Sequence, residues 1–398
     1  MIQRHDYLNT LISFRDKKLI KVVTGIRRCG KSTLFELFQD YLRSTNVSDE
    51  QIISINLEDG DYHEVETYKQ LYKLVTDRFI SDKKMYIFID EVQRVEEFQK
   101  CVDSLYIKKN CDVYITGSNA YLLSGELATL LSGRYIEIKM LPLSFKEYIS
   151  NFPDDINLER LYADYIQNSA FPYALEISKP KDRRQYLQGI YDTIVLKDII
   201  ARKKFPDIAM LKSITRFMFD NIGNLCSTKS IANTMTSAGR KISVHTVENY
   251  LTALTDSFIL YQIGRYDVKG KQYLKTGDKY YVADIGLRYA LLGTKKADMG
   301  HILENIVFLE LLRRGYEIYI GKVGNKEVDF IVIGDEGEEY YQVAYTVIDS
   351  DGSTLQRELA PLDAINDHNP KYLLTMDNTP LTSHNGIKQL NVLNWLLK

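Results

Sequence analysis

The chain has few cysteines and no long apolar run, and both shortages narrow the class of protein. Its 398 residues include four cysteines, which are widely separated and form no CxxC pair. Neither a disulfide framework nor a zinc site is therefore indicated. The first residues, MIQRHDYLNTL, contain no apolar signal core, and no run of about 18 apolar residues occurs anywhere. We expect a cytoplasmic protein that does not enter a membrane.

The chain as a whole has no large excess of charge of one sign, but one part of it does. The 51 basic and 53 acidic residues leave a net charge of −2. Residues 183–279, in contrast, contain 16 Lys and Arg against 8 Asp and Glu. A basic segment inside a nearly neutral chain is the charge pattern that attracts nucleic-acid phosphates. The length predicts two to four domains, each with its own core.

The stretch VVTGIRRCGKST at residues 22–33 joins a buried strand pattern to a glycine-rich loop. It matches G-x-x-x-x-G-K-[ST], in which backbone N–H groups surround phosphate oxygens, the lysine reaches the β and γ phosphates, and the hydroxyl ligates Mg²⁺. An amphipathic pattern follows and predicts a helix whose positive end faces the same anion. A chance glycine turn is the alternative. The predicted nucleotide-binding residues are Gly25, Ile26, Arg27, Arg28, Cys29, Gly30, Lys31, Ser32 and Thr33.

Two adjacent carboxylates end a second apolar strand pattern, KMYIFIDE at residues 84–91. At the carboxyl end of a strand, Asp90 is positioned to hold Mg²⁺ through water, and Glu91 to orient and deprotonate the attacking water. Acidic residues also end strands simply because they cap helices. Since this pair follows a phosphate loop, it indicates hydrolysis of the nucleotide, with Lys31 and Glu91 as catalytic residues.

Three further residues are candidates for the same chemistry. Strand patterns at 52–59, at 112–120 and in RYIEIKML complete a sheet. The end of the second pattern, Thr116-Gly-Ser-Asn119, with Ser118 and Asn119 as the candidates, is placed to sense the γ phosphate or its water, unless it only forms a turn. Arg134 precedes the third and would stabilise charge on the transferring phosphoryl group. It would act in cis, or across a subunit boundary in a homo-oligomer, unless it is an ordinary surface arginine.

The motifs TGIRRCGKSTL, IFIDEVQ, ITGSNA, LSGRY and LPLSFKEY, in this order, resemble those of bacterial and archaeal AAA-type ATPases that carry a C-terminal domain of unknown function. The resemblance covers nearly the full length. It implies an α/β fold, a P-loop NTPase parallel sheet of the class that has an additional strand between the two nucleotide motifs. It also implies ATP as the nucleotide, with Ser32 and Asp90 at Mg²⁺, Glu91 at the water, and Ser118 or Asn119 as the sensor.

The middle of the chain predicts a change of architecture after an ATPase core at 1–150. Residues 151–205 are mainly helical in pattern and are expected to form a lid or connector. Residues 206–282 predict a helix-turn-helix around Ala238-Gly239-Arg240, with Ser243 capping the second helix, followed by a β-hairpin. This order is typical of a winged helix, which contacts DNA or docks proteins, and the sequence leaves both open. The candidate DNA-contacting residues are Arg240, Lys241, His245 and Asn249.

Residues 283–398 predict a helix, three strands, a helix and a strand, which resembles the restriction-endonuclease-like core with its PD-(D/E)-x-K signature. Glu304 and Asp329 match the metal-binding acids of that signature. Gln342 and Ala344, however, stand where a second carboxylate and a lysine are expected. An amide is a poorer ligand for Mg²⁺ than a carboxylate, and alanine carries no charge. We predict a degenerate nuclease fold with at most a vestigial metal site at Glu304, Asp329 and Gln342.

Two alternatives stay open for this C-terminal region. Lys322 or Lys326 would restore the missing lysine if either reached in from a neighbouring strand, and Glu304 and Asp329 would otherwise be ordinary surface acids. For the whole chain, we predict an Mg²⁺-dependent ATPase whose nucleotide cycle controls the C-terminal module and acts on DNA through residues 206–282. The alternatives are a nucleotide-gated protein-interaction switch or adaptor without DNA binding, and an active Mg²⁺-dependent nuclease.

Overall fold

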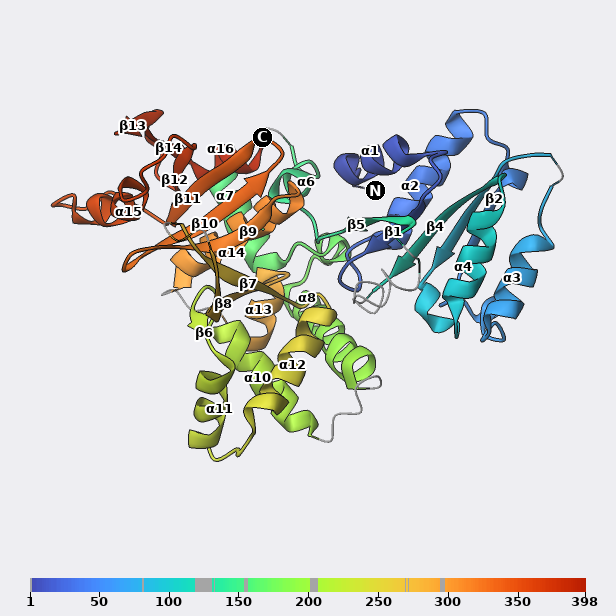
Figure 1. Ribbon diagram of the computed structural model, residues 1–398, viewed down its shortest axis with the longest axis horizontal. Helices are drawn as coiled ribbons and strands as arrows, with labels where there is room; N and C mark the ends of the chain where they lie inside the picture. The colour runs from blue at the N-terminus through green and yellow to red at the C-terminus, as the bar shows by residue number, and fades with distance from the viewer. Residues whose placement is uncertain are drawn as a thin grey trace. The chain divides into compact units, whose positions relative to one another are not determined.

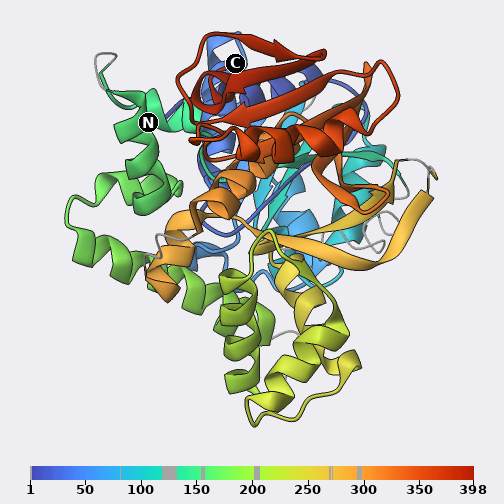
Figure 2. The same ribbon diagram turned by 90° about the vertical axis from the view of Figure 1, so that its left-hand side faces the viewer.

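The structure, a computed structural model, describes residues 2–80, 82–118, 131, 133–153, 157–200, 207–268, 270, 272–293 and 298–398. The chain forms two compact units (Figures 1 and 2). The first comprises Met1–Pro142 with Asp256–Phe258, and the second comprises Leu143–Thr255 with Ile259–Lys398. Among the helices that the structure describes, none is long and apolar enough to cross a membrane.

A parallel five-stranded sheet forms the centre of the first unit. Its strand order is β2-β3-β4-β1-β5. Strand β4 therefore lies between β1 and β3, the two strands that lead into the predicted nucleotide motifs, as expected for a P-loop sheet with an additional strand. The elements are α1 His5–Phe14, β1 Ile20–Thr24, α2 Lys31–Ser44, η1 Asp49–Gln51, β2 Ile52–Asn56, η2 Gly60–Tyr62, α3 Tyr68–Thr76, β3 Met85–Asp90, η3 Val92–Arg94, α4 Phe98–Ile107, β4 Cys111–Gly117 and β5 Tyr135–Lys139.

Helices cover both faces of this sheet (Figure 1). Phe35 and Phe38 of α2 pack against Phe88 of β3 and Tyr114 of β4, with ring centroids 4.8 to 6.5 Å apart within the group. Side chains alternate along a strand, so the neighbours of Phe88 point to the opposite face. There they join a core with the apolar residues of α3 and α4. Burial on both faces explains why β1, β3 and β4 are mostly apolar, and why their few polar residues are buried as well.

The second unit contains a nine-stranded sheet among its described residues, in the order β13-β14-β12-β11-β10-β9-β7-β8-β6. Helices precede, interrupt and flank this sheet. The elements are α6 Phe145–Ile149, α7 Leu158–Asn168, η5 Pro172–Glu176, α8 Pro180–Asp192, η6 Thr193–Ile200, α10 Ile208–Asp220, β6 Leu225–Cys226, α11 Thr228–Ser237, α12 Val244–Asp256, β7 Leu260–Asp267, β8 Gln272–Val282, α13 Ile285–Leu292, α14 Met299–Arg313, β9 Glu317–Val323, β10 Lys326–Gly334, β11 Gly337–Ala344, α15 Ser353–Asp363, β12 Lys371–Thr375, β13 Thr382–His384, β14 Ile387–Asn391 and α16 Val392–Leu396.

The helix-turn-helix and hairpin expected at 206–282 have the predicted elements. Helices α11 and α12 flank the turn at 238–240, and the hydroxyl of Ser243 accepts a hydrogen bond of 3.1 Å from the backbone N–H of Thr246, which caps α12. Strands β7 and β8 form the antiparallel hairpin, and the short β6 pairs with β8. Helices α10, α11 and α12 lie together below the strands in Figure 2.

The hairpin is part of the same sheet as the C-terminal strands, which the sequence did not predict. Strand β7 runs parallel to β9, with Arg265 opposite Ile320. The expected boundary at 282/283 therefore does not separate two compact units, and the first unit ends at Pro142 rather than at 150. The reason is that an edge strand leaves unpaired N–H and C=O groups, which pairing with β9 satisfies.

The C-terminal part has the predicted order of a helix, three strands, a helix and a strand. Strands β9, β10 and β11 are antiparallel, and β12, which follows α15, pairs parallel to β11. Helix α14 is buried from Ile302 to Leu311. One consequence is that the polar side chains of α14, among them Glu304, are held inside the unit and need partners there.

Candidate functional site

The phosphate loop lies between the end of β1 and the start of α2. Gly25 has φ +146°, and a Cβ atom there would lie 2.1 Å from the backbone oxygen of Met140. Gly30 has φ +105° and precedes the first residue of α2, Lys31. Both positions need glycine, because a side chain would clash at the first and be strained at the second. The backbone N–H groups at the start of α2 are those that would donate hydrogen bonds to a phosphate.

Side chains hold this loop from several directions. The guanidinium of Arg4 donates hydrogen bonds to the backbone oxygens of Cys29, at 2.9 Å, and Leu141, at 2.8 Å. Cys29 is fully buried, and burial raises the pKa of its thiol. Arg27 pairs with Glu58 at 2.5 Å. These contacts fix the loop without using the side chain of Lys31.

The ammonium of Lys31 is buried at the centre of the loop. Its Nζ atom donates to the backbone oxygens of Gly25, at 3.0 Å, and Ile26, at 3.4 Å, and lies 3.9 Å from Oε1 of Glu91. Neutral carbonyl oxygens are weaker partners for a cation than phosphate oxygens. Lys31 is therefore held at the loop by contacts that a phosphate ligand can replace.

The two predicted acids come to this lysine from the end of β3. Asp90 is the last residue of β3. Glu91 has φ +54° and ψ +45°, a left-handed conformation that costs a residue with a side chain about 1–3 kcal/mol. The hydroxyl of Ser118 donates to Oε2 of Glu91 at 2.9 Å, and Gln93 donates to the same oxygen. These hydrogen bonds hold the Glu91 carboxylate near Lys31, with Oε1 at 3.9 Å from Nζ.

Thr116, near the end of β4, connects the two acids and was not among the predicted site residues. Its hydroxyl donates to Oδ1 of Asp90 and accepts a 3.0 Å hydrogen bond from the backbone N–H of Glu91. The signal was present in the sequence, since Thr116 belongs to the motif ITGSNA, but only the parallel pairing of β3 with β4 makes it a neighbour of the acids.

Asp90 also lies next to the predicted metal-ligating hydroxyl. Burial raises the pKa of Asp90, while hydrogen bonds from Ser32 and Thr116 lower it. The close charge of Glu91 raises this pKa further, and that of Lys31 lowers it. The exposed hydroxyl of Ser32 beside the buried carboxylate of Asp90 is a donor set of hard oxygens, which suits Mg²⁺. The residues present therefore fit the metal that the sequence predicted.

Two of the predicted catalytic residues are not placed at this site. Asn119 lies outside the described residues. Arg134 precedes β5, whose first residue pairs with Ile20 at the opposite end of β1 from the loop. The intervening strand spans about 13 Å at the rise of a parallel strand. Arg134 instead lies over the ring of Tyr106, 5.5 Å from its centroid. The arginine does not reach the loop of its own chain, so only a role across a subunit boundary stays a prediction.

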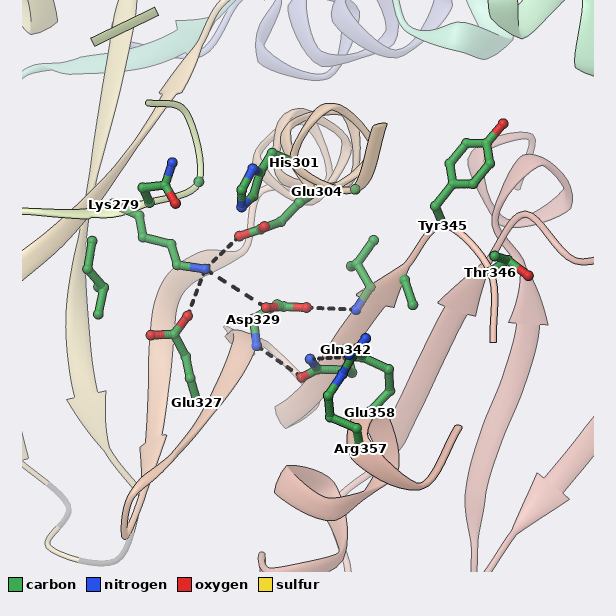
Figure 3. Close-up of a pocket in the computed structure, with 16 residues that line it drawn as sticks. Lys279, His301, Glu304, Glu327, Asp329, Gln342, Tyr345, Thr346, Arg357 and Glu358 are labelled. Carbon is green, nitrogen blue, oxygen red and sulfur yellow. Dashed lines mark hydrogen bonds and ion pairs between the residues drawn. The ribbon is translucent and has the colours of Figure 1, made fainter. Parts of the chain in front are cut away.

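The three residues of the predicted vestigial metal site do come together, in a pocket of the second unit of about 650 Å³ (Figure 3). Glu304 comes from α14, Asp329 from β10 and Gln342 from β11. The amide oxygen of Gln342 accepts from the backbone N–H of Asp329 at 3.3 Å, and its nitrogen donates to Glu358 at 2.9 Å. Among the described residues, no group of three or more His, Cys, Asp or Glu is arranged to hold a metal ion.

A lysine does enter this pocket, but it is neither of the two that the sequence suggested. The Nζ atom of Lys326 donates to the backbone oxygen of Ala360, and neither Lys322 nor Lys326 lines the pocket. Lys279 of β8 lies there instead, bonded to Glu304 at 2.8 Å. It was missed because it belongs to the hairpin assigned to another domain, and only the shared sheet brings it to the acids.

The predicted DNA-contacting residues share an exposed surface at the second helix of the pair. Arg240, Lys241, His245 and Asn249 are all exposed. His245 and Asn249 are one turn apart on α12 and lie 3.4 Å from each other, and the His245 side chain is 82% exposed. Buried Val247 and Tyr250 on the opposite side of α12 fix its orientation. This side of α12 is therefore available to a partner.

Comparison with known proteins finds two family matches, one in each part of the chain. Residues 17–149 match the family described as AAA domain, and residues 159–298 match a domain of unknown function, DUF8612. An uncharacterised protein of Haemophilus influenzae is 42% identical over 402 residues, covering 100% of this chain and 99% of the relative. The uncharacterised protein MJ1544 of Methanocaldococcus jannaschii is 32% identical over 349 residues, covering 82% of this chain and 74% of the relative.

One solved structure supports the fold assignment. The Walker-type ATPase PABY2304 of Pyrococcus abyssi has 16% sequence identity and a TM-score of 0.52, with 73% of this chain and 96% of that chain covered. At this identity the likeness concerns the fold alone. Together with the five-stranded parallel sheet and the AAA match, it identifies the first unit as a P-loop domain of the AAA type.

Proposed function

From the premise that this chain belongs to the family of its Haemophilus influenzae and Methanocaldococcus jannaschii relatives, a family with an AAA domain at residues 17–149, we propose that it hydrolyses ATP with Mg²⁺. The observation that carries the proposal is the meeting of Lys31 with Asp90 and Glu91 at one edge of the sheet. A domain that only bound a nucleotide would not need a strained, hydrogen-bonded glutamate beside the lysine.

Each of these residues has a defined task in the proposed reaction. The N–H groups of the loop and of the first turn of α2 donate hydrogen bonds to the phosphates. Lys31 leaves its carbonyl partners and contacts the β and γ phosphates. Ser32 and Asp90 would hold Mg²⁺, which offsets charge on the phosphates. Glu91 orients the attacking water and accepts its proton, while Ser118 keeps that carboxylate in position.

The proposal is tested by steady-state phosphate release from ATP by the full chain. Glu91→Gln should lower kcat about 100-fold or more, because the amide cannot accept the proton, while ATP still binds. Glu97→Gln is a matched control, since Glu97 is a left-handed glutamate on the same connection that pairs only with Lys100 at the surface. Hydrolysis by Glu91→Gln at the rate of the Glu97→Gln control would refute the role of Glu91.

We further propose that the second unit contacts DNA through a winged helix. Helix α10, strand β6, helices α11 and α12, and the β7–β8 hairpin follow one another in the order of that motif, and β6 pairs with β8. The exposed side of α12 carries His245 and Asn249, with Arg240 and Lys241 just before it. The local excess of basic residues at 183–279 favours a polyanion over a protein as the partner.

Titration of duplex DNA at several salt concentrations tests this part. The paired variant Arg240→Ala/Lys241→Ala should weaken binding and reduce the slope of log affinity against log salt by about 2, one for each phosphate that the variant no longer neutralises. Lys179→Ala/Lys181→Ala removes two exposed charges outside 206–282 and serves as the control. No DNA affinity at low salt, or a slope that the first variant leaves unchanged, would favour the protein-interaction adaptor instead.

A nuclease is the weaker proposal for the C-terminal part. Gln342 and Ala344 replace the expected carboxylate and lysine, and the nearby Glu358 accepts a hydrogen bond from Gln342. An Mg²⁺-dependent nicking activity that disappears in Asp329→Ala would support cleavage. Its absence on single-stranded, duplex and branched DNA would leave binding as the role of this region.

A further inference from the structure

The pocket of Figure 3 contains an ion cluster that neither the proposed hydrolysis nor the proposed DNA contact uses. Lys279 of β8 points into the pocket between α14 and β10. Its Nζ atom lies 2.8 Å from Oε1 of Glu304, 2.8 Å from Oε1 of Glu327 and 3.9 Å from Oδ1 of Asp329. The phenol of Tyr281 donates to the same oxygen of Glu304 at 2.6 Å. One cation thus lies at the centre of three carboxylates.

Burial makes this arrangement depend on a cation. The side chains of Lys279 and Glu304 are 5% and 7% exposed, and that of Asp329 is 13% exposed. Carboxylates removed from water repel one another and lose hydration, so a buried group of them requires a positive partner or protons. Burial and the charge of Glu304 raise the pKa of Asp329 well above its ordinary value. A cation among these side chains lowers the cost of holding them together in the pocket.

Lys279 is positively charged in this environment. Burial would lower its pKa, but the carboxylates of Glu304, Asp329 and Glu327 outweigh burial and raise it above the ordinary value. An ammonium has three N–H donors and no acceptor, and here it faces three acidic side chains. The contacts to Glu304 and Glu327, both 2.8 Å, have the length of ammonium–carboxylate hydrogen bonds, and Asp329 lies further away at 3.9 Å. The space between the acids is filled by nitrogen.

We propose that Lys279 is a built-in cation that takes the place of a divalent metal ion between Glu304, Glu327 and Asp329. The pocket then holds its carboxylates together without a metal. Two neighbouring features agree with this. Gln342, an amide, occupies the position of a further acid, and Glu358 bonds to that amide rather than to the cluster.

The built-in cation also joins parts of the second unit that are distant in sequence. Lys279 belongs to the β7–β8 hairpin, Glu304 to α14, and Glu327 and Asp329 to β10. A metal ion would exchange with solvent, whereas a lysine is permanent and fixes β8 to α14 and β10. The inference requires neither hydrolysis of ATP nor binding of DNA, so its test is independent of both.

The test measures Mn²⁺ binding and melting temperature of the full chain without nucleotide. Lys279→Ala should lower the melting temperature and create one Mn²⁺ site, and saturating Mn²⁺ should raise the melting temperature again by about 5 °C or more. The double variant Lys279→Ala/Glu327→Gln removes one ligand of the new site and should abolish both effects. Any Mn²⁺ bound near Asp90 is unaffected by Glu327→Gln, which separates the two locations.

Two outcomes would overturn the proposal. One is a Lys279→Ala protein that folds, yet neither binds Mn²⁺ through Glu327 nor is stabilised by it. The other needs no change at Lys279: wild-type protein that binds Mn²⁺ in a manner abolished by Glu327→Gln would show that the metal displaces the lysine. If Lys279→Ala does not fold, Mn²⁺ binding by wild type is compared with Mn²⁺ binding by Glu327→Gln. Equal Mn²⁺ binding by the two proteins supports the built-in cation.

Discussion

Two buried lysines, one in each unit, have opposite kinds of partners. Lys31 of the phosphate loop is held by two backbone carbonyl oxygens and lies 3.9 Å from its nearest acid, Glu91. Lys279 of the second unit is surrounded by three carboxylates, two of them at 2.8 Å. The first lysine keeps its charge available for a ligand. The second has its charge compensated within the protein.

This difference teaches what separates a ligand-binding cation from a structural one. A charge paired with carboxylates has little to gain from a new anion, because it must first give up strong, charge-assisted hydrogen bonds. A charge that rests on neutral carbonyl groups exchanges weak partners for strong ones when a phosphate arrives. The same residue type therefore serves binding in one unit and cohesion in the other.

The largest predicted effect comes from removing each lysine in turn. Lys31→Ala should lower ATP hydrolysis by about 100-fold or more, because charge on the phosphates loses its nearest cation. Lys279→Ala should instead destabilise the second unit by about 3–5 kcal/mol, since it leaves carboxylates buried without a partner. ATP turnover, ATP affinity and thermal unfolding, measured on both variants, check the contrast.

The contrast between the lysines fails if the two variants behave alike. A Lys279→Ala protein with weakened ATP affinity but unchanged unfolding would mean that the second lysine also serves the nucleotide. A Lys31→Ala protein destabilised as strongly as Lys279→Ala, in the absence of nucleotide, would mean that the loop lysine is structural.

A smaller effect is expected from Thr116, the hydroxyl that aligns the two acids next to Lys31. Thr116→Val keeps the shape but removes the hydrogen bonds to Asp90 and from the N–H of Glu91. Loss of a buried hydrogen bond costs about 1–3 kcal/mol, and if that cost falls on the transition state kcat decreases about 5-fold to 150-fold.

Thr116→Ser restores the hydroxyl and should recover most of the rate. Because Thr116 acts through the acids rather than on the phosphates, the KM for ATP should stay near its wild-type value in both variants. A parallel rise of KM with an unchanged kcat would contradict this positioning role.

The smallest effect concerns pH and compares Lys279 with a third buried lysine, Lys21 of β1. Lys21 pairs with one carboxylate, that of Asp112, and burial outweighs this partner and lowers the pKa of Lys21. The unfolded chain then binds more protons, so the stability that depends on Lys21 rises with pH toward its unfolded pKa of about 10.4. Lys279 has a raised pKa, so its contribution is complete below about pH 10.4 and is lost above it.

Unfolding free energies of wild type, Lys21→Met and Lys279→Met between about pH 8 and 11 separate the two cases. The difference between wild type and Lys21→Met should increase with pH in this range. The difference between wild type and Lys279→Met should stay constant and then fall. Two curves of the same slope would mean that the number of carboxylates around each lysine does not control its charge.

Much of the first unit follows from local sequence patterns. The loop from Gly25 to Ser32, the acids at 90 and 91 and the strand at 111–117 are each encoded within a few residues, and parallel strands bring their carboxyl ends to one edge. A role of Arg134 at the loop of its own chain is not supported, because a residue just before a strand lies at the opposite edge from a loop that follows one. Thr116 was overlooked because its partners come from another strand.

The second unit shows what such patterns omit. The order of helices and strands was predictable, and so was the meeting of Glu304 with Asp329. The lysine was sought within one domain at 283–398, however, while the structure takes it from β8 of the hairpin, since β7 pairs with β9. A division of the chain into domains by sequence assumes that each sheet is built from strands of one continuous segment. Here one sheet combines strands of the hairpin with strands of the C-terminal part.

The amino-acid sequence by itself determined the local chemistry: the conformation of the loop at Gly25 and Gly30, the ends of the strands, the cap at Ser243 and the absence of a carboxylate at position 342. These depend on residues that are neighbours along the chain. Only the tertiary structure decided which charges face each other. It therefore decided that the charge of Lys31 stays available for a ligand, while the charge of Lys279 is compensated by carboxylates. The physical reason is that electrostatic energy depends on distance and burial, which strand pairing and packing set between residues far apart in sequence.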